Sequence, residues 1–383
     1  MGVHAVPAHV LELILLRLDS PICLLRAAST CKLWRRVIAC AGFLHQFRSL
    51  HGPPPVAAVY YDRPRKPRQC PDFVCTPSVH IDGRFFSLDF LPDSGATPWV
   101  WRVEDSRGSL LLLDRLPGAG GSAWYRDMVV CEPLTRRYAR IAPRAVFRGY
   151  DILGAHLIDG EAGGIGVSNF RVVCRLHSDG LHRDAGVLAV GRHYHRRSWR
   201  KVSIDRLMLA AGPSMELSPT SLCWYNGGRR MVGLDRSTGE FSSVVLPEVE
   251  DWDFHKETFS SVVVPGGDGE ARIVLSGASG DLKVFARLHS GEWGLEKSIR
   301  LSEVAHDLPG YNPSYFNQPL LIHTTDSPVI HASPWQERPW WFHLDIETTE
   351  VAPAPDPSVE KAYPCELPWP PTLEACTEQL LDV

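Results

Sequence analysis

Several signals that would mark an enzyme, a secreted protein or a membrane protein are missing from this chain. It has no Gly-x-Ser-x-Gly, P-loop or His-Glu-x-x-His motif, which removes common signatures of a nucleophile, a nucleotide site and a zinc site. No stretch approaches the roughly 18 apolar residues that cross a bilayer, and no N-terminal run ends in a small-residue cleavage site. No Asn-x-Ser/Thr sequon occurs, because Pro313 interrupts the candidate at Asn312. These absences favour a non-catalytic protein that is neither secreted nor embedded in a membrane.

Net charge and the spacing of the cysteines further restrict the class of protein. The net charge is -4, the sequence pI is ≈ 6.5, and Lys and Arg are scattered, so we expect no nucleic-acid partner. Ten cysteines contain no C-x-x-C pair, which argues against a metal site or a disulfide framework. We therefore expect an intracellular protein, cytoplasmic or nuclear, with reduced and mostly buried thiols and with no metal or cofactor.

What the chain does have is enough apolar material for more than one core. Hydrophobic residues make up 44% of 383 residues, which is ample for two domains. The pattern predicts an α+β multidomain protein: an all-α module over 1–50, a Pro/Arg-rich linker and entry strand over 51–79, an all-β domain over 80–355, and a C-terminal tail or closing strand over 356–383.

The N-terminal 50 residues show helical periodicity. Apolar residues recur at helical spacing in the first segment, at Leu11, Ile14, Leu15 and Leu18. Pro7 suits a first turn, and Ser20 with Pro21 can end this helix and start a second one. Ser29 or Thr30 can cap a third helix. A fourth apolar set follows, at Phe43, Leu44, Phe47 and Leu50.

This module has more large apolar side chains than its own small core needs. Domains of about 45 residues are marginal alone, so we expect part of the apolar stripe to be buried against a partner. Six basic residues against Glu12 and Asp19 give a local charge of 6 − 2 = +4, which favours an acidic partner. Two alternatives stay open: a solvated basic face, and docking onto the chain's own large domain.

Two segments of the module resemble an F-box. Residues 6–18 are similar to its opening, and residues 24–38, with Cys31, Lys32 and Trp34, are similar to its second half. The sequence departs from the usual pattern at Val6 and Leu13. The resemblance implies a SKP-family adaptor as partner and, through it, a cullin. It places the following residues at or behind the adaptor interface: Pro7, Leu11, Ile14, Leu15, Leu18, Leu24, Leu25, Cys31, Lys32, Trp34 and Ile38.

Beyond residue 80 the helical period gives way to short apolar runs between turn residues, which predicts strands. Examples are residues 109–113, 128–131, 186–190, 272–275 and 320–323. A weak repeat runs through this region, marked by Thr135, Trp199, Thr238, Trp293 and Thr348, with spacings of 64, 39, 55 and 55. In the Thr units an acidic residue begins a tight turn, where its side chain can bond the turn's backbone.

A unit of about 50 residues suits one four-stranded blade, so we expect a β-propeller of about six blades. Residues 106–112, 130–135 and 234–241 resemble the F-box-associated propeller-like region of large plant F-box families. A pair of β-sandwiches or another closed β architecture stays open as an alternative.

The remaining motifs fit ordinary structural roles better than sites. His193 and His195 share a strand face but have no nearby acid or cysteine, and Arg196 and Arg197 would repel a cation. Asp93, Asp251 and Asp253 lack a paired base or nucleophile. The glycine-rich runs 118–121 and 160–166 do not lie between a strand and a helix, so we interpret them as turns. Most of the tryptophans, including Trp99, Trp101, Trp340 and Trp341, are expected in the core, although some can form a recognition rim.

The sequence thus predicts a non-catalytic substrate-recognition subunit of an SCF-type (SKP–cullin–F-box) ubiquitin ligase. The helical module would bind the adaptor, and the β domain would bind an unknown target protein. Two other functions stay open: a glycan- or ligand-binding, or enzymatic, β-propeller whose helices cap the fold, and an F-box scaffold acting outside ubiquitination.

Overall fold

The structure is a computed structural model of the whole chain. It describes residues 7–368 except for 19–20, 53, 62–69, 80, 93–98, 118–126, 142–146, 148–149, 161–163, 178–182, 191–197, 204–214, 219–220, 226–228, 251, 254–259, 266–269, 278–279, 318–319, 325–328, 335–339 and 355–361. Two compact units divide the chain. The first comprises Met1–Asp179, Ala185–Val202 and Lys361–Val383, and the second comprises Gly180–Asp184 and Ser203–Glu360.

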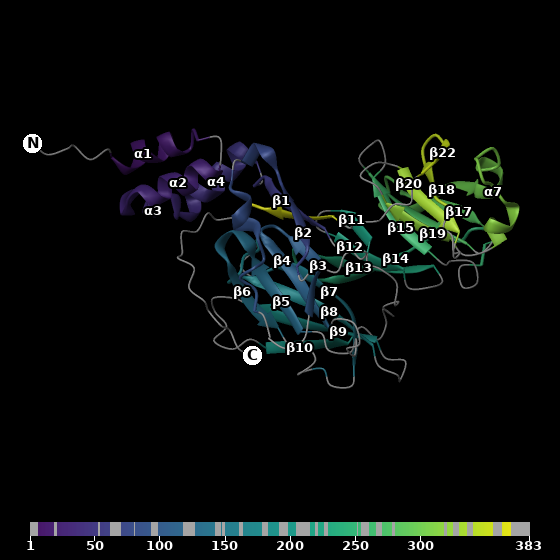
Figure 1. Ribbon diagram of the computed structural model, residues 1–383, viewed down its shortest axis with the longest axis horizontal. Helices are drawn as coiled ribbons and strands as arrows, with labels where there is room; N and C mark the ends of the chain where they lie inside the picture. Colours follow the sequence, from purple (N-terminus) through teal and green to yellow (C-terminus); the bar gives the residue numbers. More distant parts are fainter. Residues whose placement is uncertain are drawn as a thin grey trace, which may run out of the picture. The chain divides into compact units, whose positions relative to one another are not determined.

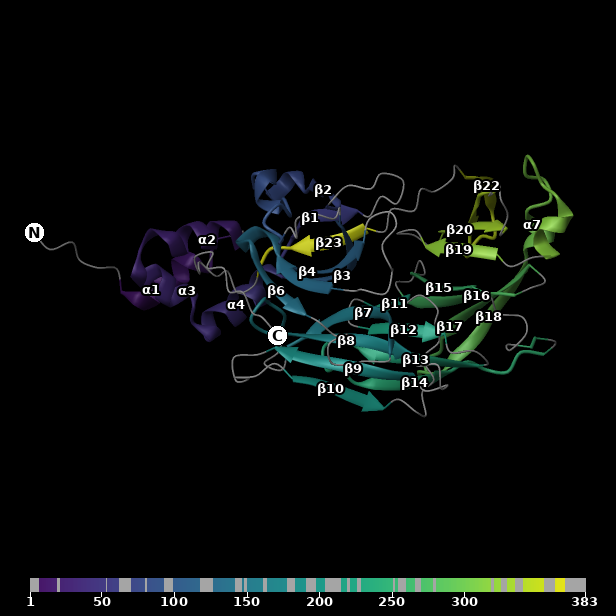
Figure 2. The same cartoon turned by 60° about the horizontal axis from the view of Figure 1, so that its bottom comes forward.

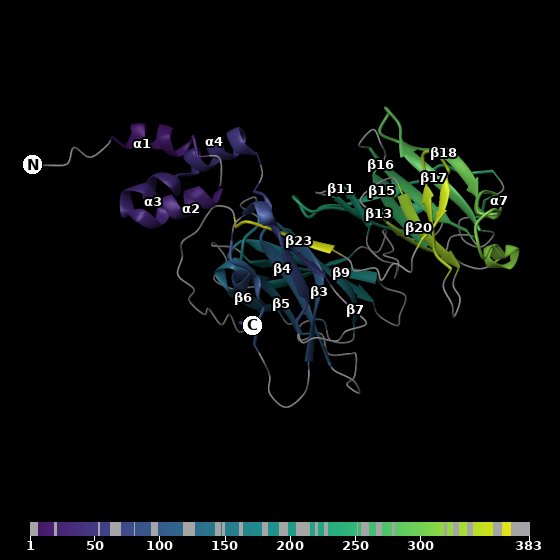
Figure 3. The same cartoon turned by 45° about the horizontal axis from the view of Figure 1, so that its top comes forward.

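The chain is mostly β, preceded by a small helical module. The four predicted helices are present, as α1 (Ala8–Leu15), α2 (Pro21–Thr30), α3 (Lys32–Ile38) and α4 (Ala41–His51), and they form one bundle (Figures 1 and 3). Pro7 takes the N-cap of α1 with extended backbone, at φ -56 and ψ 142. The prediction that Ser29 or Thr30 caps α3 is wrong. Cys31 is the N-cap, and the Thr30 hydroxyl instead donates to Ala27 O at 2.8 Å.

The first unit contains three antiparallel sheets. One has the order β2-β1-β23, with β1 (Val56–Tyr61), β2 (Asp72–Cys75) and β23 (Ala362–Glu366). The second runs β3 (Trp99–Arg107), β4 (Leu110–Pro117), β5 (Asp127–Glu132) and β6 (Arg137–Ile141). The third runs β7 (Asp151–Asp159), β8 (Phe170–His177), β9 (Arg183–Val190) and β10 (Ser198–Ser203). Short 3₁₀ turns lie at η1 (Pro77–Val79), η2 (Gly83–Phe86) and η3 (Pro133–Thr135).

The second unit contains three more sheets of four strands. The first runs β11 (Met215–Ser218), β12 (Ser221–Tyr225), β13 (Arg230–Asp235) and β14 (Phe241–Val245). The second runs β15 (Ser260–Pro265), β16 (Ala271–Ser276), β17 (Asp281–Arg287) and β18 (Trp293–Arg300). The third runs β19 (Leu320–Thr324), β20 (Val329–Pro334), β21 (Phe342–Asp345) and β22 (Val351–Pro353). Between β18 and β19 lie α7 (Leu301–Val304) and η4 (Pro313–Asn317).

Within each unit, one sheet is buried on both faces. In β4, Leu111 and Leu113 pack against the β2-β1-β23 sheet, while Leu110 and Leu112 pack against the β7–β10 sheet. In the second unit β16 does the same, with Val274 on one face and Ile273 on the other. This explains why these strands are continuous apolar runs rather than alternating ones.

The C-terminal segment supplies a strand. Residues 362–366 form β23, which pairs with β1 from Tyr61↔Ala362 to Val56↔Glu366 (Figure 2). The first and last described strands therefore share one sheet, and the rest of the predicted 356–383 segment, apart from 367–368, lies outside the described residues.

The sequence repeat corresponds to a repeated hairpin. Thr135, Thr238 and Thr348 lie between the third and fourth strands of three sheets, and Trp199 and Trp293 lie in the fourth strands β10 and β18. The turn chemistry is confirmed for two units. Asp235 Oδ1 accepts from the N–H groups of Ser237 and Thr238, at 2.7 and 3.1 Å. Asp345 Oδ1 accepts from those of Glu347 and Thr348, at 2.8 and 3.0 Å.

The first repeat uses a variant of this turn. Glu132 Oε2 accepts from the Thr135 hydroxyl at 2.6 Å, where the other two units use backbone N–H groups. All three turns then place one residue in the left-handed region, at Arg136 (φ 57), Gly239 (φ 78) and Thr349 (φ 63). The shared backbone path explains the repeat, because one strand–turn–strand unit recurs along the chain.

Candidate partner-binding surface

The helical module has its own closed core. Its buried cluster consists only of helical-module residues, at Leu11, Leu15, Leu16, Leu24, Ala27, Ala28, Ile38, Phe43 and Phe47. The ends of α1 and α4 are tied together, because His51 Nε2 lies 2.8 Å from Leu16 O and the His51 ring lies 4.3 Å from the Phe47 ring. The core of the module is therefore complete without a contribution from the sheets.

A second apolar face of α1 remains uncovered. Val10, Leu13 and Ile14 are 36%, 60% and 51% exposed, and their spacing of i, i+3 and i+4 places them on one side of the helix. Leu33, at the start of α3, is also exposed. We call Val10, Leu13 and Ile14 the α1 face. Large aliphatic side chains gathered on one exposed helix face are typical of a partner-binding site.

The structure separates the predicted adaptor-binding residues into three groups. Those in the core are Leu11, Leu15, Leu24 and Ile38. Those that are half-buried are Leu18 and Trp34. Those that are exposed are Pro7, Ile14, Cys31 and Lys32. The side chain of Leu25 lies outside the described residues. A partner could touch the exposed group directly, whereas the buried group can act only by shaping the module.

Sequence reasoning missed Val10 and Leu13 as surface residues. It selected a single stripe through Leu11, Ile14 and Leu15, but the module buries Leu11 and Leu15 and turns Ile14 outward. The signal that could have found the second face is the width of the apolar surface, because His9 and Glu12 are the only polar residues of α1. A short helix with so wide an apolar surface needs neighbours on more than one side.

The turn between α2 and α3 lies at the surface and carries an exposed thiol. Cys31 is exposed and caps α3 with its backbone, whose carbonyl accepts from Arg35 N at 3.1 Å. The nearby backbone N–H of Trp34, which would stabilise the charged form, lowers the pKa of the Cys31 thiol below its ordinary value.

Basic side chains dominate the surface of the module. Arg17, Lys32 and Arg36 are exposed, and Arg35 donates from Nε to Ala28 O at 3.2 Å. Glu12 is the only acidic residue of the described part of the module. An acidic partner with an apolar patch would match both the α1 face and these charges.

The other motifs of the sequence carry no site in the described residues. No group of three or more His, Cys, Asp and Glu that could hold a metal ion is found there. The predictions for His193, His195, Asp93 and Asp251, and for the 118–121 glycine run, lie outside the described residues, as does the side chain of Trp99. Trp101 and Trp341 are buried, whereas Trp340 is half-buried.

The second glycine run lies between strands β7 and β8, and its residues 161–163 are outside the described residues. Across them Gly160 N donates to Gly164 O at 2.9 Å, which fits the predicted turn. A Cβ at Gly160 would lie 1.9 Å from Asn169 Oδ1, so the Asn169 side chain would have to move. A phosphate cradle would need a helix after such a loop.

The thiols that the structure describes are free. Four of them are buried, two are exposed and three are intermediate. Burial raises the pKa of Cys223 to about 12, and it also raises that of Cys131. No helix within the described ranges is long and apolar enough to cross a membrane.

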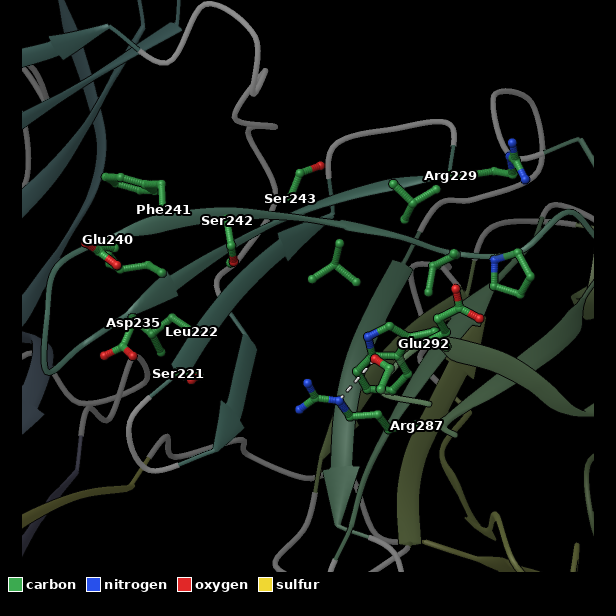
Figure 4. Close-up of a pocket in the computed structure, with 18 residues that line it drawn as sticks. Ser221, Leu222, Arg229, Asp235, Glu240, Phe241, Ser242, Ser243, Arg287 and Glu292 are labelled. Atoms are coloured by element: carbon green, nitrogen blue, oxygen red, sulfur yellow. Dashed lines mark hydrogen bonds between the residues drawn. The ribbon is translucent and has the colours of Figure 1, made fainter. Parts of the chain in front are cut away.

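The second unit holds a groove of about 890 Å³ (Figure 4). One side is the β13–β14 hairpin, including Gly233, Ser242 and Val244, and the other side is the β17–β18 hairpin, including Arg287 and Trp293. Arg287 Nε donates to Gly291 O across its own hairpin at 3.4 Å. A groove of this size is large enough for a small ligand or a few residues of peptide.

Comparison with known proteins gives only remote likenesses. No family model and no curated protein matches the chain. A mutant Aleuria aurantia lectin in complex with alpha-methyl-L-fucoside is 10% identical, covering 72% of this chain and 80% of its own, with a TM-score of 0.36. The Cps50 (Swd1) β-propeller domain of Myceliophteria thermophila is 9% identical, covering 68% and 86%, with a TM-score of 0.34.

A post-proline cleaving enzyme from Rickettsia typhi is 11% identical, covering 92% of this chain and 58% of its own, with a TM-score of 0.36. TM-scores this low do not establish a common fold. The architecture therefore rests on the strand pairing described above.

Proposed function

We propose that the chain is the substrate-recognition subunit of an SCF-type ubiquitin ligase. In this proposal α1–α4 form an F-box that binds a SKP-family adaptor, and the six sheets form a β-propeller that holds a target protein. The observation that carries the proposal is the α1 face, which stays exposed although the module already has a closed core.

The propeller part of the proposal is supported by the sheets. Six sheets follow one another along the chain, five of them with four strands, and three have one left-handed residue in the turn between the third and fourth strands. β23 pairs with β1, so the last described strand lies in the same sheet as the first, an arrangement that a ring of blades would use for closure.

The mechanism would be proximity rather than bond chemistry. A target held by the sheets is brought near a ubiquitin-loaded subunit that assembles on the cullin, so the effective concentration of target lysines rises. The chain itself needs no nucleophile, metal or cofactor for this role.

Co-expression with a SKP-family adaptor tests the proposal. We expect the wild-type chain to co-purify with the adaptor and Ile14→Asp to lose it, because a carboxylate would be buried in an apolar groove. Ile14 is a sharper choice than Trp34 or Leu18, which pack against the module's own core. Leu50→Asp is the matched control, since Leu50 is 62% exposed on α4 and lies outside the α1 face.

The outcomes separate the competing functions. Adaptor binding that survives Ile14→Asp and Leu13→Asp together would contradict the assignment of the α1 face. An adaptor complex that recruits no cullin would identify a scaffold that acts outside ubiquitination. Failure of the wild-type chain to bind the adaptor would remove the ligase function and favour a ligand-binding β protein.

A further inference from the structure

The fourth strands of the sheets differ in how their edges are protected. In each four-stranded sheet, the strand that comes last in the sequence lies at an edge of the sheet. Exposed edges pair with other chains unless charge, proline or a bulge prevents it. β6, β10 and β18 contain charged residues, and β22 ends in Pro353. β14, with the sequence Phe-Ser-Ser-Val-Val, contains neither.

The backbone groups that β14 presents at this edge follow from the hydrogen bonds at its two ends. Asp235 N donates to Glu240 O at 3.0 Å, and Leu246 N donates to Arg229 O at 2.8 Å. Bonded and non-bonded pairs alternate along an antiparallel ladder. Residues 240, 242, 244 and 246 therefore bond to β13.

By the same alternation, Phe241, Ser243 and Val245 direct their N–H and C=O groups outward. These outward groups have no backbone partner within the described part of the chain. Ser243 is exposed, and Val245 is 53% exposed. The edge of β14 therefore offers three donor–acceptor pairs in a row.

The groove lies beside this edge. Ser242 and Val244 face it from β14, Gly233 faces it from β13, and Trp293 forms part of the opposite side. Gly233 lies opposite Ser242, and a Cβ there would lie 2.7 Å from Ser242 Oγ. A strand added to β14 would direct every second side chain into this groove.

The two ends of β14 carry opposite charges. Glu240 precedes the strand, and Arg229 pairs with Leu246 just beyond it; Figure 4 shows the two side chains at opposite ends of the hairpin. Neither side chain has an ion-pair partner in the part of the chain that the structure describes. By the ladder alternation both belong to the face that meets the groove.

We propose that β14 binds an extended segment of a target polypeptide as an added antiparallel strand, with side chains in the groove beside Trp293. In that orientation the peptide runs from Arg229 toward Glu240, so it carries an acidic residue at its N-terminal end and a basic residue at its C-terminal end. Small apolar residues lie opposite Val244 and Ser242. This inference rests on the proposed function, because only that function makes the bound polypeptide a ligase target.

The probe is a fluorescein-labelled peptide, Glu-Thr-Val-Thr-Val-Thr-Lys, added to the full-length chain and followed by fluorescence anisotropy. Its fourth residue faces Ser243, whose groups point outward, and its fifth faces Ser242, whose groups do not. We expect N-methylation of the fourth residue to weaken binding by about fivefold or more, since it removes a backbone hydrogen bond. N-methylation of the fifth residue should change binding by less than about twofold.

A pair of variants tests the same edge from the side of the protein. Ser243→Pro removes the outward N–H and leaves the ladder to β13 intact, which is where an edge strand tolerates proline. Ser243→Ala keeps that N–H. We expect the proline variant to bind the probe about fivefold more weakly than the alanine variant, with thermal unfolding of both recorded to confirm the fold.

Charge reversal tests the orientation. Arg229→Glu combined with Glu240→Lys should favour the probe with its terminal Glu and Lys exchanged over the original one. Absence of saturable probe binding, or equal weakening by N-methylation at both positions, would overturn the proposal. If the chain fails to bind the adaptor but still distinguishes N-methylation at the fourth residue from that at the fifth, only the ligase function is removed. If the chain binds the adaptor but does not make this distinction, only the present inference is removed.

Discussion

The helical module and the β sheets differ in how completely their apolar side chains are covered. The sheets at β3–β6 and β15–β18 are covered on both faces by their neighbours. The module closes a small core and still leaves the α1 face in contact with solvent. A domain this small has little stability to spare. The difference indicates that the β3–β6 and β15–β18 sheets are covered by the chain itself, whereas the module is suited to completion by a partner.

The ends of the elements show the same contrast. The N-caps of α1, α3 and α4 are Pro7, Cys31 and Cys40, and none of them makes a side-chain capping bond. The hairpins of the second unit are held by Asp235 and Asp345, whose carboxylates accept backbone N–H groups. A missing cap costs a helix about 1 kcal/mol. The module therefore lacks local stabilisation that the hairpins have.

The largest expected effect comes from removing a large buried side chain from the core of the helical module. Leu24 is fully buried in α2, and Leu24→Ala should cost about 2–5 kcal/mol, enough to unfold the module while the sheets remain folded. Leu13→Ala, on the α1 face, should change stability by less than about 0.5 kcal/mol. Amide hydrogen exchange over residues 8–51 and over the strands measures both. Equal destabilisation by the two variants would mean that the α1 face is already covered.

Local sequence patterns predicted the elements well. The four helices and strands such as β4, β5 and β16 lie where periodicity placed them, because one stripe or one apolar run decides a helix or a strand. The turn role of Asp235 and Asp345 was also predicted, since an Asp side chain bonds backbone within two or three residues.

The parts that failed depend on contacts distant in the sequence. Leu11, Ile14 and Leu15 form one stripe by spacing, and only the packing of α1 on α2 and α3 decides that Ile14 is exposed. To cap α3, the Thr30 hydroxyl would have to accept from a backbone N–H, but it donates back to Ala27 O instead. The groove at β14 needs two hairpins that are about 50 residues apart, so its one signal in the sequence is a strand without charge or proline.

A smaller effect is expected from removing one hairpin's carboxylate. Asp345→Ala should cost about 1 kcal/mol, because the N–H groups of Glu347 and Thr348 lose their acceptor. Asp345→Asn keeps an acceptor oxygen and should lose less than half of that. Denaturant unfolding of the full chain measures the difference. Equal losses from both variants would show that charge, rather than the hydrogen bonds, holds this turn.

The last prediction compares the alkylation of two thiols, Cys31 and Cys223, and involves no change in the free energy of unfolding. Because the N–H of Trp34 lowers the pKa of Cys31, a larger share of this exposed thiol is thiolate at a given pH than in a free cysteine. Its rate of alkylation by iodoacetamide should therefore level off at a lower pH than that of N-acetylcysteine amide. Cys223, whose pKa burial raises to about 12, should not react in the folded chain at the same pH.

Mass spectrometry of both positions gives the two pH profiles, and exposed Cys40 serves as a second surface thiol in the same module. If the adaptor covers the turn between α2 and α3, its addition should slow alkylation of Cys31 and leave the inert Cys223 unaffected. Alkylation of Cys31 that follows the profile of the free amide would show that the α3 N-terminus is frayed in solution. The module would then depend on a bound partner to order α3.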